Sequence, residues 1–258
     1  MDKVLIRERT REALGKSYEL EEFVRELQEL LQSLADREAT RNYQRIIPDT
    51  GRFYGVPKPI LWIVASETGK FIEKESERAQ RLLEAIWAEG SFEARQIAGK
   101  SLAKFGPKNP RICLDFVSSA LPDLDNWSVC DGLAMYGVRP IVYSNPELVL
   151  PLSEKWINSC DKWTRRFGVV TLLGYKRVGA TERVFELLDM VMEDGERDVR
   201  KAVSWILREI TSQNPDEVAE FLIRWARAHP SRDARRVITD GMKKLAKHEQ
   251  GRILDLLD

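Results

Sequence analysis

A repeat of about 35 residues is the feature that most constrains the fold of this chain. The dipeptide Asn-Pro recurs at Asn109, Asn145 and Asn214, and each copy is followed by apolar residues at helical spacing. Asparagine is a favourable N-cap, and proline at the first helical position loses no needed hydrogen bond. Between the last two copies, Thr181 and Glu182 open a similar segment. These positions predict helix starts at matching points of a repeating unit.

A second set of amphipathic segments follows the same period. They are FEARQIAGKSL, NWSVCDGLAMY, WTRRFGVVTLL, DVRKAVSWIL and RDARRVITDGM. This alignment places Arg95, Asp131, Arg166, Arg200 and Arg235 in register, at spacings of 36, 35, 34 and 35 residues. Two helices per repeat, stacked side by side, predict an all-α fold. We expect an α-solenoid of HEAT-like helix-pair repeats, with one concave surface lined by the second helix of each pair.

The repeats organise the whole chain into one predicted domain over residues 1–258. Residues 76–258 are expected to hold five helix-pair repeats, residues 21–75 the N-terminal helices, and residues 1–20 a possible N-terminal extension. A further helix is expected to open near Pro59. Glycine and proline concentrate at the joints, and alternating apolar patterns with hairpin residues are missing. Little or no β-sheet is therefore expected.

Composition narrows the class of protein. With 32% charged and 43% hydrophobic residues, the chain is expected to be folded and not membranous, and no apolar run approaches the roughly 20 residues of a spanning helix. A charged N-terminus argues against a secretory signal. Cys113, Cys130 and Cys160 lack metal-ligand spacing, which indicates reduced thiols, no zinc site and a cytoplasmic location. With only His229 and His248, histidine catalysis and metal binding are not expected.

The formal net charge is zero, but the charges are unevenly distributed. Residues 200–252 contain 12 Lys and Arg against 7 Asp and Glu. Such an excess can give a neutral protein a basic, nucleic-acid-binding face. An ordinary solvated helix surface explains the same excess at least as well.

Three tryptophans and one carboxylate fall on the second helices. Trp127 lies one turn before Asp131, Trp163 three residues before Arg166, and Trp205 five residues after Arg200. Core packing explains a lone tryptophan more often than ligand binding does, and an Asp131–Arg166 ion pair between adjacent repeats is an equally good structural alternative. Asp131 is nevertheless the one carboxylate in a register of arginines, which suits a cationic ligand.

The cations of the same surface suit a phosphate backbone. Arg166, Arg200, Lys201 and Arg208 can bind phosphates, while indole faces such as that of Trp163 can pack on sugars or attract cations. Because Asp131 would repel the backbone, binding alone does not account for it. Chemistry on a positively charged nucleobase does.

At these residues the sequence resembles the DNA alkylation repair glycosylases of the AlkD type. The matching stretches are NWSVCD (126–131), KWTRRFGVVTLLGYK (162–176) and VRKAVSWILREITSQNP (199–215), and YGVPKPIL (54–61) is similar to the family's N-terminal turn. The likeness extends over most of the chain from about residue 20. It departs from the family at the first twenty residues and at Trp62, where an arginine is expected.

The resemblance implies both an activity and its residues. Asp131, Trp127, Trp205 and Arg166 match the family's active-site positions. The implied enzyme hydrolyses the N-glycosidic bond of cationic N3- and N7-alkylpurines in double-stranded DNA, such as 3-methyladenine and 7-methylguanine. It is implied to be a monofunctional, metal-free and cofactor-free monomer that need not flip the base, located in the cytoplasm with the nucleoid. Two alternatives remain open: a non-catalytic binder of DNA structures on the same scaffold, and a protein-binding HEAT scaffold.

Overall fold

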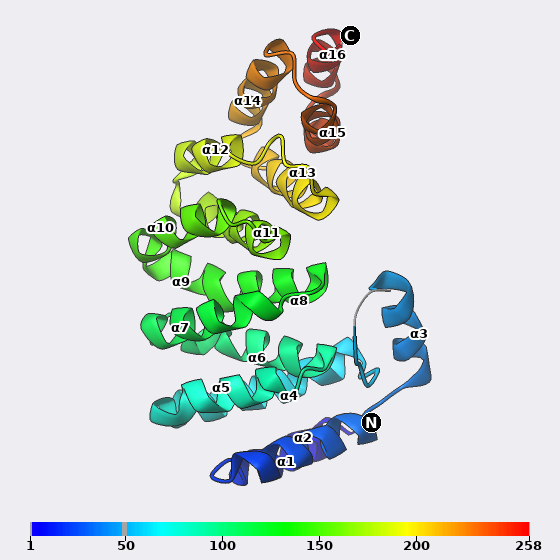
Figure 1. The fold of residues 1–258 in the computed structure, drawn as a ribbon, viewed down its shortest axis with the longest axis vertical. Coiled ribbons are helices and arrows are strands. Elements are labelled where there is room, and N and C mark those ends of the chain that lie inside the picture. Colours follow the sequence, from blue (N-terminus) through cyan, green and yellow to red (C-terminus); the bar gives the residue numbers. More distant parts are fainter. Residues whose placement is uncertain (1, 48–50, 258) are drawn as a thin grey trace. The chain divides into compact units, whose positions relative to one another are not determined.

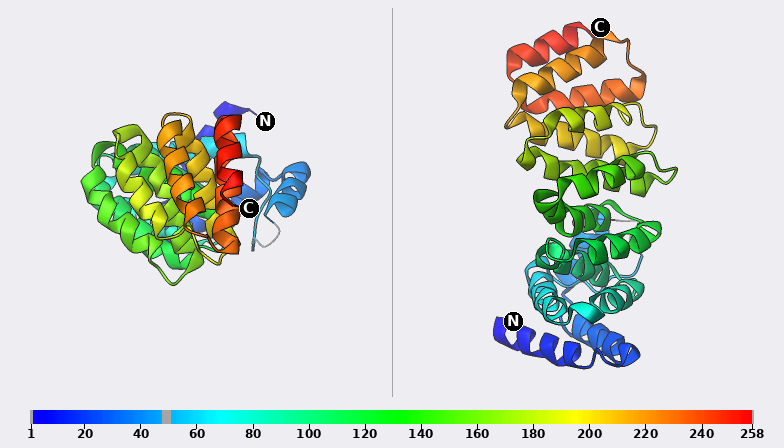
Figure 2. Two further views of the ribbon diagram at one scale, coloured as in Figure 1. Left: turned by 90° about the horizontal axis from the view of Figure 1, so that it is seen from above. Right: turned by 90° about the vertical axis from the view of Figure 1, so that its left-hand side faces the viewer.

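The computed structural model describes residues 2–47 and 51–257, and every regular element in this part of the chain is a helix (Figures 1 and 2). The predicted all-α, helical-repeat fold is confirmed. Within the same residues, no helix is both long enough and apolar enough to cross a bilayer. The chain divides into two units, Met1–Ser144 and Asn145–Asp258, which are described separately below. The single domain expected from the sequence stays a prediction.

The first unit is a stack of helices in which α4 packs between α1 and α6, and α6 packs against α8 and η3. A second row packs beside it, with α5 against α2 and α7. The elements are α1 (Lys3–Gly15), α2 (Leu20–Ser33), α3 (Arg37–Ile46), α4 (Lys58–Lys74), η1 (Ser76–Arg78), α5 (Ala79–Ala88), α6 (Phe92–Phe105), α7 (Pro110–Ala120), η2 (Leu121–Asp123), α8 (Trp127–Gly132), η3 (Leu133–Val138) and α9 (Arg139–Ser144).

The second unit continues the helix-pair pattern, with α13 packed between α11 and α15 and with α14 against α16. Its elements are α10 (Pro146–Ile157), α11 (Lys162–Thr171), η4 (Leu172–Val178), α12 (Thr181–Asp189), α13 (Arg197–Thr211), α14 (Pro215–Arg227), α15 (Arg232–Gly241), η5 (Met242–Lys244) and α16 (Lys247–Asp255). Large side chains such as Phe105 and Phe116 in the first unit and Phe167 in the second are fully buried. Each contributes about 1.5–3 kcal/mol of hydrophobic stabilisation.

The Asn-Pro dipeptides begin helices, as the sequence predicts. Asn109, Asn145 and Asn214 are the N-cap residues of α7, α10 and α14, with proline at the first helical position. The side chains of Asn109 and Asn214 make no capping hydrogen bond, and Asn214 instead donates to Glu217 at 3.0 Å. Proline therefore contributes more to these starts than the asparagine side chain does, because its φ is already helical.

The N-terminal extension is an integral helix of the first unit. The apolar face of α1, which includes Ile6 and Leu14, is buried, and the helix packs on α4. Glu67 of α4 is only 3% exposed at its side chain and accepts from Arg11 Nε at 2.8 Å and from Lys70 Nζ at 2.7 Å. Burial acts to raise the pKa of Glu67, but the hydrogen bonds and charges of Lys70 and Arg11 together outweigh it, so the pKa is lowered. The ion pair between Arg11 and Glu67 thus ties α1 to α4.

Two buried carboxylates hold the segment that leads into α4. Glu93, at the start of α6, is fully buried and accepts hydrogen bonds from the backbone N–H groups of Tyr54, Gly55 and Val56. Glu89 accepts from the Tyr54 hydroxyl at 2.9 Å. Burial, followed by the hydrogen bond to Glu89, raises the pKa of Tyr54 to about 12.

A tight helix crossing in the second unit gives a stability test. A Cβ at Gly168 of α11 would lie 2.8 Å from the backbone nitrogen of Ile157 and 2.9 Å from Trp156 Cβ. Gly168→Ala is therefore expected to lower the free energy of unfolding by about 1–3 kcal/mol through overpacking. Urea denaturation followed by circular dichroism measures this.

Gly251 of α16 is the matched control, because nothing lies within 4 Å of the position of its Cβ. Gly251→Ala should raise stability by about 0.5–1 kcal/mol, since alanine costs less conformational entropy in a helix. Equal effects of the two substitutions would show that α10 and α11 do not approach as closely as described.

Candidate functional site

The second helices of five successive repeats share a strict register, and we call α6, α8, α11, α13 and α15 the register helices. Their N-cap residues are Ser91, Asn126, Asp161, Glu196 and Ser231, each 35 residues after the one before. Equivalent positions are therefore found by counting from the N-cap. This count corrects the alignment made from sequence, in which the spacing varied between 34 and 36.

The fourth residue after each N-cap is the position of the repeated arginine. It is Arg95, Cys130, Arg165, Arg200 and Arg235 in the five register helices. The predicted register, which placed Asp131 and Arg166 with these arginines, was wrong by one residue in those two repeats. The exception among the arginines is the buried Cys130, not Asp131. The direction in which a helical side chain points depends on its distance from the N-cap. The alignment from sequence matched arginines by residue type and therefore took Arg166 in place of the neighbouring Arg165.

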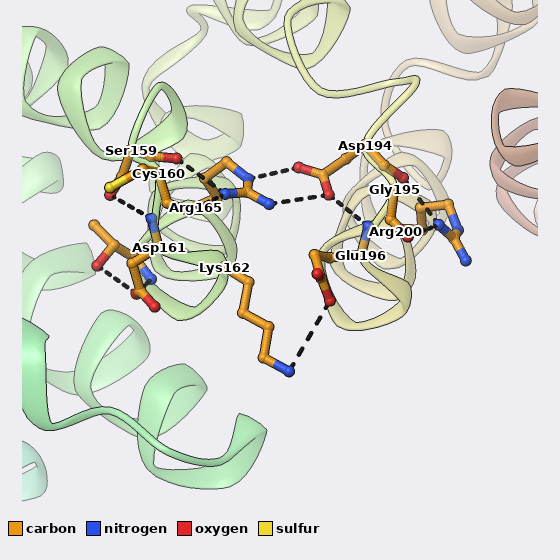
Figure 3. Close-up of polar contacts among 10 residues, drawn as sticks. Ser159, Cys160, Asp161, Lys162, Arg165, Asp194, Gly195, Glu196 and Arg200 are labelled. Atoms are coloured by element: carbon orange, nitrogen blue, oxygen red, sulfur yellow. Dashed lines mark hydrogen bonds and ion pairs between the residues drawn. The ribbon is translucent and has the colours of Figure 1, made fainter.

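Arg165 and Arg200 show what the fourth position does (Figure 3). Arg165 donates to the carbonyls of Ser159 and Cys160, six and five residues earlier, and to the Asp194 carboxylate at 2.6 Å. Arg200 makes the same pair of local bonds, to the carbonyls of Asp194 and Gly195. The Asp194 carboxylate raises the pKa of the Arg165 guanidinium.

Arg200 was predicted to bind DNA, and its described contacts are internal. Besides the two local carbonyls, it pairs with Asp233 of α15 at 3.3 Å, and its side chain is 12% exposed. Arg208 likewise pairs with Asp240 at 2.6 Å. These contacts join α13 to α15. A role for either arginine in DNA binding stays a prediction.

The fifth residue after the N-cap links adjacent repeats within each unit. Gln96 Nε2 donates to the Ser128 carbonyl at 2.9 Å, and Arg166 Nη1 donates to the Asp198 carbonyl at 2.5 Å. Ser128 and Asp198 occupy the same position of the following register helix. Asp131 occupies this fifth position in α8, where a carboxyl group has no N–H to donate. Asp131 is thus the exception at the fifth position, because its side chain cannot donate the hydrogen bond that Gln96 and Arg166 donate.

In the first unit, Trp127 and Asp131 lie one turn apart on α8. Asn126 caps this helix by accepting from the backbone N–H groups of Ser128 and Val129 at 3.1 and 3.0 Å. Trp127, the first residue of the helix, is 38% exposed and so belongs to the exposed large apolar side chains of the described residues. Asp131 is half-buried. The exposed indole is not a core residue, in contrast to the commoner role of a lone tryptophan.

In the second unit the predicted site residues lie on α11 and α13. Trp163 and Trp205 are half-buried, whereas Arg166 is 6% exposed. Trp205 lies four residues after Lys201, so both occupy one face of α13. Lys201 is exposed and is the fifth residue of its helix, the position that Arg166 occupies in α11.

A basic pocket of about 420 Å³ opens between α13 and α15. Its charged lining residues are the cations Arg197, Arg200, Lys201 and Arg236 and the single carboxylate Asp240. Arg197 and Arg236 were not singled out from the sequence, although their positions one and five residues after the N-cap could have identified them. An excess of cations in a pocket of this size suits a phosphate group.

The predicted site is therefore described in two parts. The structure brings Trp127 and Asp131 together on one helix, and it brings Arg200, Lys201 and Trp205 together on another. Asp131 lies in the first unit, whereas Arg166 and Trp205 lie in the second. The predicted proximity of Asp131 to these two residues therefore stays a prediction.

The fold and these positions define a helical-repeat protein whose register helices carry a tryptophan–aspartate pair and a basic surface. The model of the family of DNA alkylation repair enzymes matches residues 27–245, and the chain belongs to this family. A search of curated proteins gave no match.

Solved structures share the fold. A predicted DNA alkylation repair enzyme from Enterococcus faecalis aligns with a TM-score of 0.69 at 19% identity, over 83% of this chain and 97% of its own. AlkD2 from Streptococcus mutans aligns with a TM-score of 0.60 at 19% identity, over 80% of this chain and 99% of its own. The helix α1 precedes the residues matched by the family model.

Proposed function

We propose that this protein is a DNA glycosylase that removes cationic N3- and N7-alkylpurines from double-stranded DNA. The observation that carries the proposal is the pair on α8: an exposed Trp127 one turn from Asp131, in a chain that belongs to the DNA alkylation repair family. The basic pocket between α13 and α15 supports it, because it suits the phosphates of the same DNA.

The chemistry requires little more than a well-placed negative charge. The alkylated purine carries a positive charge, and cleavage of its bond to C1′ leaves both electrons on the base, which departs neutral. The sugar becomes oxocarbenium-like, and a nearby carboxylate stabilises this cation. Asp131 supplies that charge and orients the water whose oxygen bonds to C1′, accepting the proton that the water releases.

The aromatic and cationic residues position the DNA. The face of Trp127 packs on the deoxyribose and attracts the developing cation, an interaction worth about 0.5–2 kcal/mol. Trp205 supplies a second aromatic surface, and Arg166 and Lys201 hold flanking phosphates. Because the base leaves without protonation, no general acid is needed at the purine. The reaction proceeds without a metal, a lyase lysine or extrusion of the base into a pocket.

Incubation with DNA methylated at purine nitrogens tests the proposal. The wild-type protein is expected to release 7-methylguanine or 3-methyladenine in single-turnover reactions, detected by chromatography of the free bases. Unmethylated DNA is the control and should release no base, because a neutral purine is a far poorer leaving group. If methylated DNA also releases nothing, the glycosylase proposal fails and the chain is a non-catalytic DNA binder or a scaffold.

A further inference from the structure

A cluster of two aromatic rings and three cations lies on the first unit, apart from the residues discussed above. We call it the α4–η3 patch, and it consists of Lys58, Trp62, Lys100, Tyr136 and Arg139. The rings of Trp62 and Tyr136 meet edge to face, with centroids 5.7 Å apart. Lys100 Nζ lies 3.7 Å from the Tyr136 centroid and 5.6 Å from that of Trp62, and Lys58 Nζ lies 5.5 Å from Trp62.

The helical register explains why these residues meet. Trp62 is the fifth residue after Pro57, the N-cap of α4. It therefore occupies the position that Gln96 occupies in α6 and Asp131 in α8. Lys100 is the ninth residue after the N-cap of α6, the position that Trp205 occupies in α13. Tyr136 lies in η3, a π-helical turn, and is the tenth residue after Asn126, the N-cap of α8. The wider π turn brings Tyr136 beside Lys100; such turns are frequent at functional sites.

The patch has cations without counter-ions. Within residues 2–47 and 51–257, no carboxylate lies within the 4.0 Å ion-pair limit of Lys58, Lys100 or Arg139. Burial, followed by repulsion from Arg139, lowers the pKa of Lys100. The buried Nε of Arg139 has no hydrogen-bond partner. In the free protein these neighbouring cations repel one another, and a bound anion would offset this repulsion.

A pocket extends the patch along α4 and α6. It has a volume of about 250 Å³, and its lining includes the small residues Ser66, Gly69 and Ser101 and the cations Lys70, Lys100 and Lys104. A Cβ at Gly69 would lie 2.9 Å from the Ser101 carbonyl oxygen, so glycine permits this close crossing. Lys100 lines both the pocket and the aromatic pair. The pocket thus has lysines on both of its helices, Lys70 on α4 and Lys100 and Lys104 on α6.

We propose that the α4–η3 patch binds the sugar–phosphate backbone of duplex DNA, with phosphates on Lys100 and Lys58 and a sugar against Trp62 and Tyr136. Cations that contact phosphates and side chains that contact sugars hold DNA in place without reading its sequence. An acidic peptide would use the cations but leave the rings unused. The proposal rests on the function proposed above, since it assigns a second, lesion-independent contact with the same DNA. Nothing in it depends on the residues of α8.

The binding of unmodified, fluorescein-labelled duplex DNA, followed by anisotropy over a salt series, tests the patch. Lys100→Gln is expected to weaken binding several-fold at about 0.1 M salt and to reduce the salt slope by about one. Trp62→Ala is expected to weaken it several-fold through lost packing on a sugar. Lys74→Gln, an exposed lysine at the far end of α4, is the matched control and should match wild type in both respects.

A second readout locates the contact. Bound DNA should protect Lys100, more than Lys74, from acetylation measured by peptide mass mapping. Protection of Lys100 by inorganic phosphate as complete as that by DNA would indicate a phosphate site only and would overturn the proposal. So would wild-type affinity and salt slope in both Lys100→Gln and Trp62→Ala. Loss of binding in these variants, in a protein that releases no alkylated base, would uphold the patch while refuting the glycosylase.

Discussion

Replacing Asp131 with asparagine is expected to lower the single-turnover rate of alkylpurine release by about 10²–10⁴-fold, the range for loss of a group that transfers a proton in the transition state. The amide keeps nearly the same shape but has no negative charge to stabilise the sugar cation and cannot accept the proton of the attacking water. The loss should fall on the rate of the chemical step. DNA affinity should be unchanged or slightly higher, because one repulsion from the phosphate backbone is removed.

Asp115→Asn is the matched control for this experiment. Asp115 lies in the same unit, is exposed on α7, and should keep the wild-type rate after substitution. A wild-type rate in Asp131→Asn would contradict the assigned role, even if the protein is a glycosylase. Binding that survives in a protein with no activity before or after the substitution would instead favour the non-catalytic class.

Replacing Glu93 with alanine is expected to destabilise the protein by about 3–5 kcal/mol. One carboxylate oxygen accepts from Gly55 N at 2.7 Å and Val56 N at 3.0 Å, and the other accepts from Tyr54 N at 3.0 Å. Glu93 is fully buried, and its removal leaves three backbone donors without their acceptor, two of them in buried hydrogen bonds. Hydrogen bonds to charged groups contribute about 1.5–3 kcal/mol each, and their energies are not additive. Urea denaturation measures the loss.

Two further variants serve as comparisons for the stability of Glu93→Ala. Glu12→Ala, on the exposed face of α1, should change stability by less than about 0.5 kcal/mol. Glu93→Gln should fall between alanine and wild type, since the amide offers one acceptor oxygen but points an N–H₂ at a backbone donor. A loss below about 1 kcal/mol in Glu93→Ala would show that the backbone segment finds other partners.

The helices themselves could be predicted from local sequence. The Asn-Pro starts, the amphipathic second helices and the start of α4 near Pro59 all depend on N-cap chemistry and 3.6-residue periodicity. The docking of α1 could not be predicted in this way. It depends on the fit of Ile6 and Leu14 against α4 and on the ion pair between Arg11 and Glu67, 56 residues apart in the chain.

The candidate site could be predicted less completely. Trp127 and Asp131 were identified correctly as a pair on one helical face, but the register that singled out Asp131 was wrong by one residue. Counting from the caps would have corrected it, because Ser91, Asn126, Asp161, Glu196 and Ser231 are evenly spaced. The alignment followed arginine identity instead. It therefore took Arg166 where Arg165 makes the repeated contacts.

The α4–η3 patch shows where sequence reasoning fails for a physical reason. The sequence marks Trp62 only as a departure from the family, and its motifs assign no role to Lys100 or Tyr136. A π turn changes the number of residues per turn, so the face occupied by Tyr136 cannot be read from α-helical spacing. The buried Glu93 was missed because a charged residue in an amphipathic segment is normally assigned to its exposed face.

The even 35-residue spacing of the N-caps bears on how such a chain can change in length. In a repeat protein each module contacts mainly its neighbours. Duplicating a stretch that begins at one N-cap and ends before the next would keep the bonds that Gln96 and Arg166 make to a carbonyl 32 residues ahead. Adding a single residue inside a register helix would rotate every later side chain by about 100° and break them. Gene variants that alter length should therefore survive in whole modules or in the joints between helices.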